Sequence, residues 1–153
     1  MTYAKRLTIL AMTGALALCA LQPSADARRR LTDEEVTQRT VDSLNTSFNR
    51  SRPRIINFGE SAVARINLLQ ERNSRQTVID RAATTARRSI ERTHLAGNRS
   101  LESLAMKGVR DLTRRNAGTN LIEDVNAVKL NGLTGLQTVA DECYTAINSA
   151  LAD

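Results

Sequence analysis

Side chains suited to catalysis or metal binding are few in this sequence, and they are widely spaced. His94 is the single histidine, and Cys143 is one of only two cysteines. A structural zinc site draws about four ligands from clustered Cys and His residues, and no such cluster is present. His94 continues the apolar helical stripe of Ile90, so we expect a packed or half-buried helix histidine. The sequence predicts neither a metal nor a cofactor.

Carboxylates are more numerous, but their spacing does not suit acid–base catalysis. Glu123 and Asp124 are adjacent, as are Asp141 and Glu142. Adjacent residues on a helix point in different directions, whereas a catalytic pair must converge on one reacting group. No nucleophile motif or phosphate-binding loop accompanies them. We therefore predict that the protein is not an enzyme.

The arginine distribution carries the clearest binding chemistry. Residues 28–115 hold 19 basic and 10 acidic side chains, whereas residues 116–153 hold only Lys129 against five acids. A guanidinium fork matches phosphate, sulfate and carboxylate groups well. The expected polyanion-binding residues recur near one side of a helix, and they are Arg81, Arg87, Arg88, Arg92 and Arg99. The plainer alternative is a solvated face whose arginines reflect genomic composition.

The chemistry of these arginines also restricts the class of partner that they could bind. An anionic glycan or an anionic membrane surface would fit them. Nucleic acid fits less well, because aromatic residues make up only 3% of the chain and none interleaves with these arginines to stack bases.

Residues 1–27 have the pattern of a secretory signal peptide. Lys5 and Arg6 precede an apolar run over residues 7–21, which is shorter than the roughly 20 residues needed to span a bilayer. Ala25 and Ala27 supply the small residues that a signal peptidase accepts. We predict cleavage after Ala27, a periplasmic or extracellular location and no stable transmembrane span afterwards. The mature chain is then one helical domain, residues 28–153, with a basic, flexible start at residues 28–31.

Cleavage would remove Cys19 and leave Cys143 without an internal disulfide partner. Because Cys143 lies in an apolar helical stripe, we expect it to be buried as a small apolar group.

One short motif follows the predicted cleavage site. Arg29, Arg30, Leu31 and Thr32 precede three acidic residues. This segment resembles a degraded form of the Arg-x-Leu-Arg plus acidic motif of secreted oomycete effectors, with Thr32 in place of the second arginine. The resemblance covers about seven residues and implies an effector-like secreted protein as a further alternative. The same residues also form a helix capping box, with Thr32 at the N-cap and Glu35 three residues later.

The elements that position all of these residues are amphipathic helices. Apolar residues recur in steps of three and four from Val36 to Ala150. We expect helices to end near residues 49–53, at Gly97 in a left-handed turn, and near residues 116–120. The stretch over residues 53–96 is one helix or two, with a break near Asn73, and Asn131–Gly132 kinks the last helix. The predicted fold is all-α: a small bundle or hairpin of four to six helices, possibly elongated.

The apolar stripes are rich in alanine and glycine, so we expect a thin core and self-association. The expected assembly seams are Ala62, Ile66, Ile79, Ala83, Ala86 and Ile90 in one stretch, and Leu133, Leu136, Ala140 and Ile147 in another. The leading hypothesis is an exported, non-enzymatic helical protein that binds itself or another helical protein. Polyanion binding through the arginine-rich face is the alternative.

Overall fold

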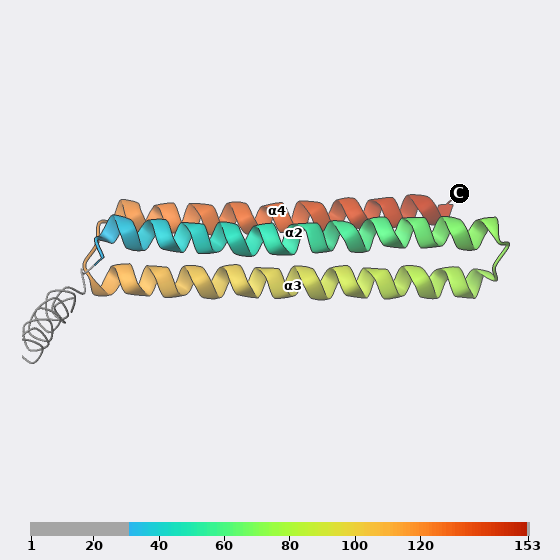
Figure 1. Ribbon diagram of the computed structural model, residues 1–153, viewed down its shortest axis with the longest axis horizontal. Helices are drawn as coiled ribbons and strands as arrows, with labels where there is room; N and C mark the ends of the chain where they lie inside the picture. Colours follow the sequence, from blue (N-terminus) through green and yellow to red (C-terminus); the bar gives the residue numbers. More distant parts are fainter. Residues whose placement is uncertain (1–30, 153) are drawn as a thin grey trace, which may run out of the picture. The chain divides into compact units, whose positions relative to one another are not determined.

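The computed structural model describes residues 31–152, which form three long α-helices (Figure 1). Helix α2 spans Asp33–Glu71, α3 spans Gln76–Arg114 and α4 spans Thr119–Ala152. Helix α3 runs antiparallel to the other two, and every pair of helices is in contact. The predicted signal peptide and the basic residues 28–30 lie outside the described residues.

The all-α bundle is confirmed, but the number of helices is three and not four to six. The predicted helix ends at residues 49–53 and at Gly97 are wrong. Helix α4 is continuous through Asn131 and Gly132, where the sequence predicts a kink and not an end. Pro53 lies inside α2 and is exposed, so solvent can reach the backbone carbonyl that its missing N–H leaves unpaired. Buried residues on both sides of it, Leu44 and Ile55, hold the two halves of α2 against one core.

Gly97 does not form a left-handed turn, because no glycine of residues 31–152 has a positive φ. It permits close packing instead. A Cβ atom built at Gly97 would lie 2.7 Å from Leu136 Cδ1 of α4 and 3.0 Å from Ser51 Oγ of α2. Gly59 likewise permits close packing of α2 against α4, because a Cβ atom built at Gly59 would lie 2.5 Å from Cys143 Sγ. These glycines let the helix backbones approach one another, so they mark contacts between helices and not helix ends.

The two turns are built alike, and both lie where the sequence predicts a break. Asn73 and Asn116 adopt positive φ angles of 50° and 55°. After the first helix, Ser74 N–H donates to Leu69 C=O and Asn73 N–H donates to Gln70 C=O. The equivalent pair of bonds closes α3, so each turn is a Schellman motif with asparagine in the left-handed position. Asparagine tolerates this conformation better than most non-glycine residues do.

The start of α2 confirms the predicted capping box. Glu35 N–H donates to Thr32 Oγ1 at 3.2 Å, and Thr32 N–H donates to the Glu35 carboxylate at 2.8 Å. Asp33 and Glu34 add negative charge to the first turn, where the helix dipole favours it.

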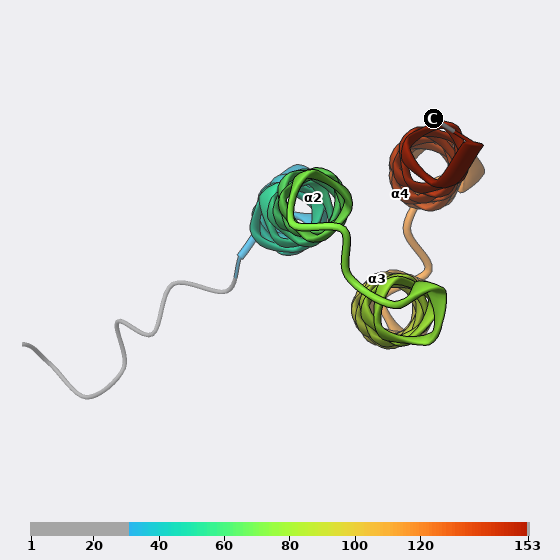
Figure 2. The same cartoon turned by 90° about the vertical axis from the view of Figure 1, so that its right-hand side faces the viewer.

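The core fills the space between the three helices, which lie at the corners of a triangle when viewed end on (Figure 2). The largest fully buried side chains are all aliphatic: Leu44, Ile55, Ile66, Ile90, Leu101, Leu112, Leu136, Ile147 and Val125. Small residues fill much of the remainder, which agrees with the thin core expected from the composition. None of the three described helices is long and apolar enough to cross a membrane.

Candidate anion-binding groove

Four of the five arginines predicted to bind a polyanion are exposed on α3. Arg81, Arg88, Arg92 and Arg99 follow one another at intervals of seven, four and seven residues, which places them along one side of the helix. Arg87 differs, because it is half-buried and its guanidinium donates to Asn148 Oδ1 on α4. The structure therefore separates Arg87 from the other four.

A surface groove runs between α2 and α3, and its walls carry arginines from both helices. One section lies near the middle of α2, and we call it the central section. It has a cavity volume of about 610 Å³ and includes Arg50 and Arg54. A second section of about 500 Å³ includes Arg65 of α2 and Arg81 of α3. A third section lies between these two and shares Arg54 with the first and Phe58 with the second, so the three sections adjoin along the two helices. We call the three together the α2–α3 groove.

The α2–α3 groove is long compared with a small-molecule pocket. Its lining residues on α2 run from Asp42 to Arg65. At about 1.5 Å of rise per residue, the groove extends for roughly 35 Å along the bundle. A ligand that occupies all of it must be extended.

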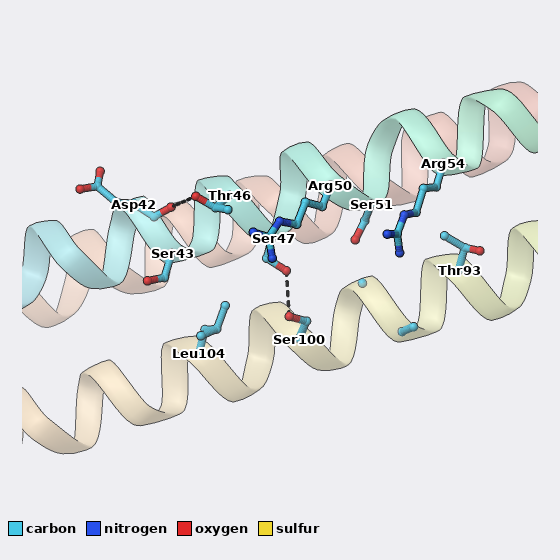
Figure 3. A pocket seen from close by; sticks show the side chains of 12 residues that line it. Asp42, Ser43, Thr46, Ser47, Arg50, Ser51, Arg54, Thr93, Ser100 and Leu104 are labelled. Atoms are coloured by element: carbon cyan, nitrogen blue, oxygen red, sulfur yellow. Dashed lines mark hydrogen bonds between the residues drawn. The ribbon is translucent and has the colours of Figure 1, made fainter.

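The groove arginines have no acidic partners in the part of the chain that the structure describes. Within residues 31–152, no carboxylate lies within 4.0 Å of the guanidinium groups of Arg50, Arg54, Arg65 or Arg81. Asp42 is the only carboxylate among the described lining residues, and it accepts a hydrogen bond from Gln38 at 2.8 Å. Figure 3 shows the side chains of Arg50 and Arg54 reaching from α2 toward α3, while the Asp42 carboxylate points away. The groove therefore presents unneutralised positive charge.

Hydroxyl groups line the same central section. Its six hydroxyl-bearing residues are Ser43, Thr46, Ser47, Ser51, Thr93 and Ser100. The Ser47 hydroxyl donates to Ser100 Oγ at 2.8 Å, which links the two helices across the floor (Figure 3). The section thus combines guanidinium donors with hydroxyl oxygens.

Arg50, Arg54 and Arg65 were not among the arginines that the sequence predicted to bind a polyanion. Their spacing of four and eleven residues is helical, so a continuous helix would have placed them on one face. The predicted helix end at residues 49–53 divided that face, and the pattern was lost.

The predicted assembly seams lie in the core of the single chain. Ala62, Ile66, Ile79, Ala83, Ile90, Leu136, Ala140 and Ile147 are buried, and Ala86 and Leu133 are half-buried. Another chain cannot reach the buried members unless the bundle opens. Their role in assembly stays a prediction, whereas the α2–α3 groove is accessible in the closed bundle.

His94 and Cys143 are placed as expected. His94 is half-buried and its Nε2 lies 3.1 Å from Asn98 Nδ2. Cys143 is buried, and its thiol donates to Ile55 C=O at 3.6 Å. Burial raises the pKa of the Cys143 thiol, and the nearby carboxylates of Glu142 and Glu60 raise it further. A buried thiol with a raised pKa is less nucleophilic than a free one, which fits the expected packing of Cys143 as a small apolar group.

Carboxylates lie near two titratable side chains of α4. Glu60 and Glu142 lie near Cys143, and Glu91 and Asp141 lie near the Tyr144 hydroxyl, whose pKa is raised by burial first and then by these two carboxylates. Within residues 31–152, no group of three or more His, Cys, Asp or Glu side chains could hold a metal ion.

The arrangement of the α2–α3 groove suits charge-assisted binding. Its polar groups include guanidinium groups, hydroxyls and the Asn57 amide, and the Asp42 carboxylate is turned away from the arginines. No protein-family model, curated protein or solved structure matches this chain.

Proposed function

We propose that this protein is an exported, non-catalytic polyanion-binding protein whose ligand lies along the α2–α3 groove. The observation that carries the proposal is the set of four groove arginines, Arg50, Arg54, Arg65 and Arg81, that have no carboxylate partner among the described residues. On α2 the unpaired guanidinium groups run from Arg50 to Arg65, about 22 Å along the helix, and such a row attracts an extended anion more strongly than a compact one.

The outer face of α3 extends the same positive surface. Arg88, Arg92 and Arg99 are exposed and follow Arg81 along one side of the helix. Arg99 is grouped with Lys107, Arg110 and a single acid, Glu102, farther along α3. A long polyanion could therefore contact the groove and this adjacent face together. The export part of the proposal depends on the pattern of residues 1–27.

The proposal is tested by salt-dependent retention on immobilised dextran sulfate. In the test variant, Arg50, Arg54, Arg65 and Arg81 are all replaced by Gln. In the matched control, four arginines outside the groove lining, Arg39, Arg52, Arg75 and Arg114, are replaced by Gln. Both variants lose the same net charge, so a difference between them reports position and not total charge.

We expect the groove variant to elute at clearly lower salt than the control. Removal of four ionic contacts should reduce the slope of log affinity against log salt by about 3, if each contact releases the 0.7–0.9 counterion equivalents seen with nucleic acids. Far-ultraviolet circular dichroism checks that both variants remain helical. Equal retention of the two variants contradicts the proposed site, and elution of the native chain without salt dependence contradicts polyanion binding itself.

A further inference from the structure

Three hydroxyl groups of the groove have a defined hydrogen-bonding state. Ser43, Thr46 and Thr93 line the central section. Each donates its proton to a backbone carbonyl four residues earlier, at 2.8, 2.7 and 2.9 Å respectively. A carbonyl oxygen cannot donate, so the direction of these bonds is fixed. The hydroxyl oxygens retain lone pairs and can only accept a further hydrogen bond.

The central section therefore offers two kinds of group to a ligand. Arg50 and Arg54 are donors that match anionic oxygens, whereas Ser43, Thr46 and Thr93 are acceptors that need a donor. A polyphosphate or a fully sulfated polymer supplies only acceptor oxygens and leaves the hydroxyl lone pairs unmatched. A polymer that carries both anionic groups and free hydroxyls satisfies both.

A third feature favours sugar rings over linear polyols. Phe58 lies in the groove beside Arg54, with 42% of its surface exposed. The face of an aromatic ring carries partial negative charge, and the C–H groups on the flat side of a sugar ring present partial positive charge. One such ring suits stacking on a single sugar unit, whereas single-stranded nucleic acid is bound by successive aromatic platforms.

We infer that the ligand of the α2–α3 groove is an acidic polysaccharide with free hydroxyl groups. In this assignment Arg50 and Arg54 bind the anionic groups, Ser43, Thr46 and Thr93 accept hydrogen bonds from sugar hydroxyls, and Phe58 packs against a ring. The inference rests on the proposed function, because it names the ligand class for the same groove. It also predicts that affinity depends on hydroxyls as well as on charge.

The test compares polygalacturonate with the same polymer after O-acetylation, which removes hydroxyl donors and keeps the carboxylates and their spacing. Polyphosphate serves as a purely anionic probe. The native chain should bind polygalacturonate about tenfold more tightly than the acetylated polymer, since a net hydrogen bond contributes a factor of a few and three are at stake.

A variant with Ser43→Ala, Thr46→Val and Thr93→Val should lose most of this preference and bind polyphosphate as the native chain does. Equal affinity of the native chain for the two galacturonate polymers overturns the inference, and this comparison needs no variant to fold. If polyphosphate and both galacturonates bind alike and the four Arg→Gln changes still weaken them all, the proposed function stands and only the sugar assignment fails. If none of the three polymers binds, both fail.

Discussion

Two sides of the bundle use the same helices for different purposes. Where α4 packs against α2 and α3, the helices approach closely through Gly59 and Gly97, and the intervening space is filled by Leu136, Cys143 and other apolar groups. On the outer side of the α2–α3 pair, the space between the helices is an open groove lined by arginines and hydroxyls.

The difference separates a side that forms the core from a side that leaves unpaired charge exposed. The side that carries α4 removes apolar surface from water, which is the main favourable contribution to folding. The groove side contributes little burial, and its unpaired charges do nothing for the stability of one isolated chain. The charge of the groove arginines is not paired with a carboxylate among the described residues. Four experiments test this difference between the two sides.

The largest expected effect is on the buried face of α4. Leu136 is fully buried, so Leu136→Ala should lower the free energy of unfolding by about 2–5 kcal/mol. Leu130 on the same helix is 61% exposed, and Leu130→Ala should change it by less than about 0.5 kcal/mol. Urea unfolding measures both. A comparable loss in the two variants would mean that the outer face of α4 is buried in solution, and the distinction between the two sides would fail.

The second effect compares two sides of α2. Gly59 faces Cys143, so the methyl group of Gly59→Ala meets the Sγ atom and should cost about 1–3 kcal/mol of stability. Ser61 is exposed and lines the groove, and Ser61→Ala should be within about 0.5 kcal/mol of the native chain. In an exposed helix the change from glycine to alanine stabilises, so a gain at Gly59 would show that the close approach of α2 and α4 is absent.

The third effect is a loss of stability at alkaline pH that arises on the α4 side. The pKa values of Cys143 and Tyr144 are raised in the folded chain above their ordinary values of 9.0 and 10.0, mainly by burial. At pH values near and above these, the unfolded chain has lost protons that the folded chain retains, so stability falls as the pH rises. Below about pH 8 both groups are largely protonated in the folded and in the unfolded chain, so neither makes the stability depend on pH.

Tyr144→Phe should make the decline between pH 9 and pH 11 less steep, as measured by urea unfolding at each pH. Arg65→Gln in the groove serves as the control, because arginine stays charged over this range and should leave the slope unchanged. An unaltered slope in Tyr144→Phe would contradict the raised pKa of the tyrosine.

The smallest effect concerns ligand binding and two carboxylates of α4. Asp124→Asn together with Glu142→Gln removes two exposed charges from α4. Screening over a distance of about 8 Å at physiological salt isolates these positions from a ligand held on the opposite pair of helices. Retention on dextran sulfate should change by less than about threefold, against the much larger loss expected for the groove arginines. A large gain in retention would mean that the ligand contacts α4 as well.

Local sequence was sufficient for several features of this protein. The helical period, the capping box of Thr32 and Glu35, and the turns at Asn73 and Asn116 follow from interactions between residues close in the chain. The apolar stripes also predicted the core, because Ile66, Ile90 and Leu136 recur at helical spacing and are fully buried.

Tertiary packing determined the number of helices and the position of the groove. Pro53 and Gly97 are helix-ending residues by local preference, yet packing on either side of each keeps α2 and α3 continuous. The bundle therefore has three helices where the sequence predicted four to six. The groove could not be found in one segment either, since Arg54 and Arg81 share it only after α3 folds back along α2. The cost of a glycine or a proline inside a helix is about 1–3 kcal/mol, and the free energy gained by burying a long apolar helix face is larger.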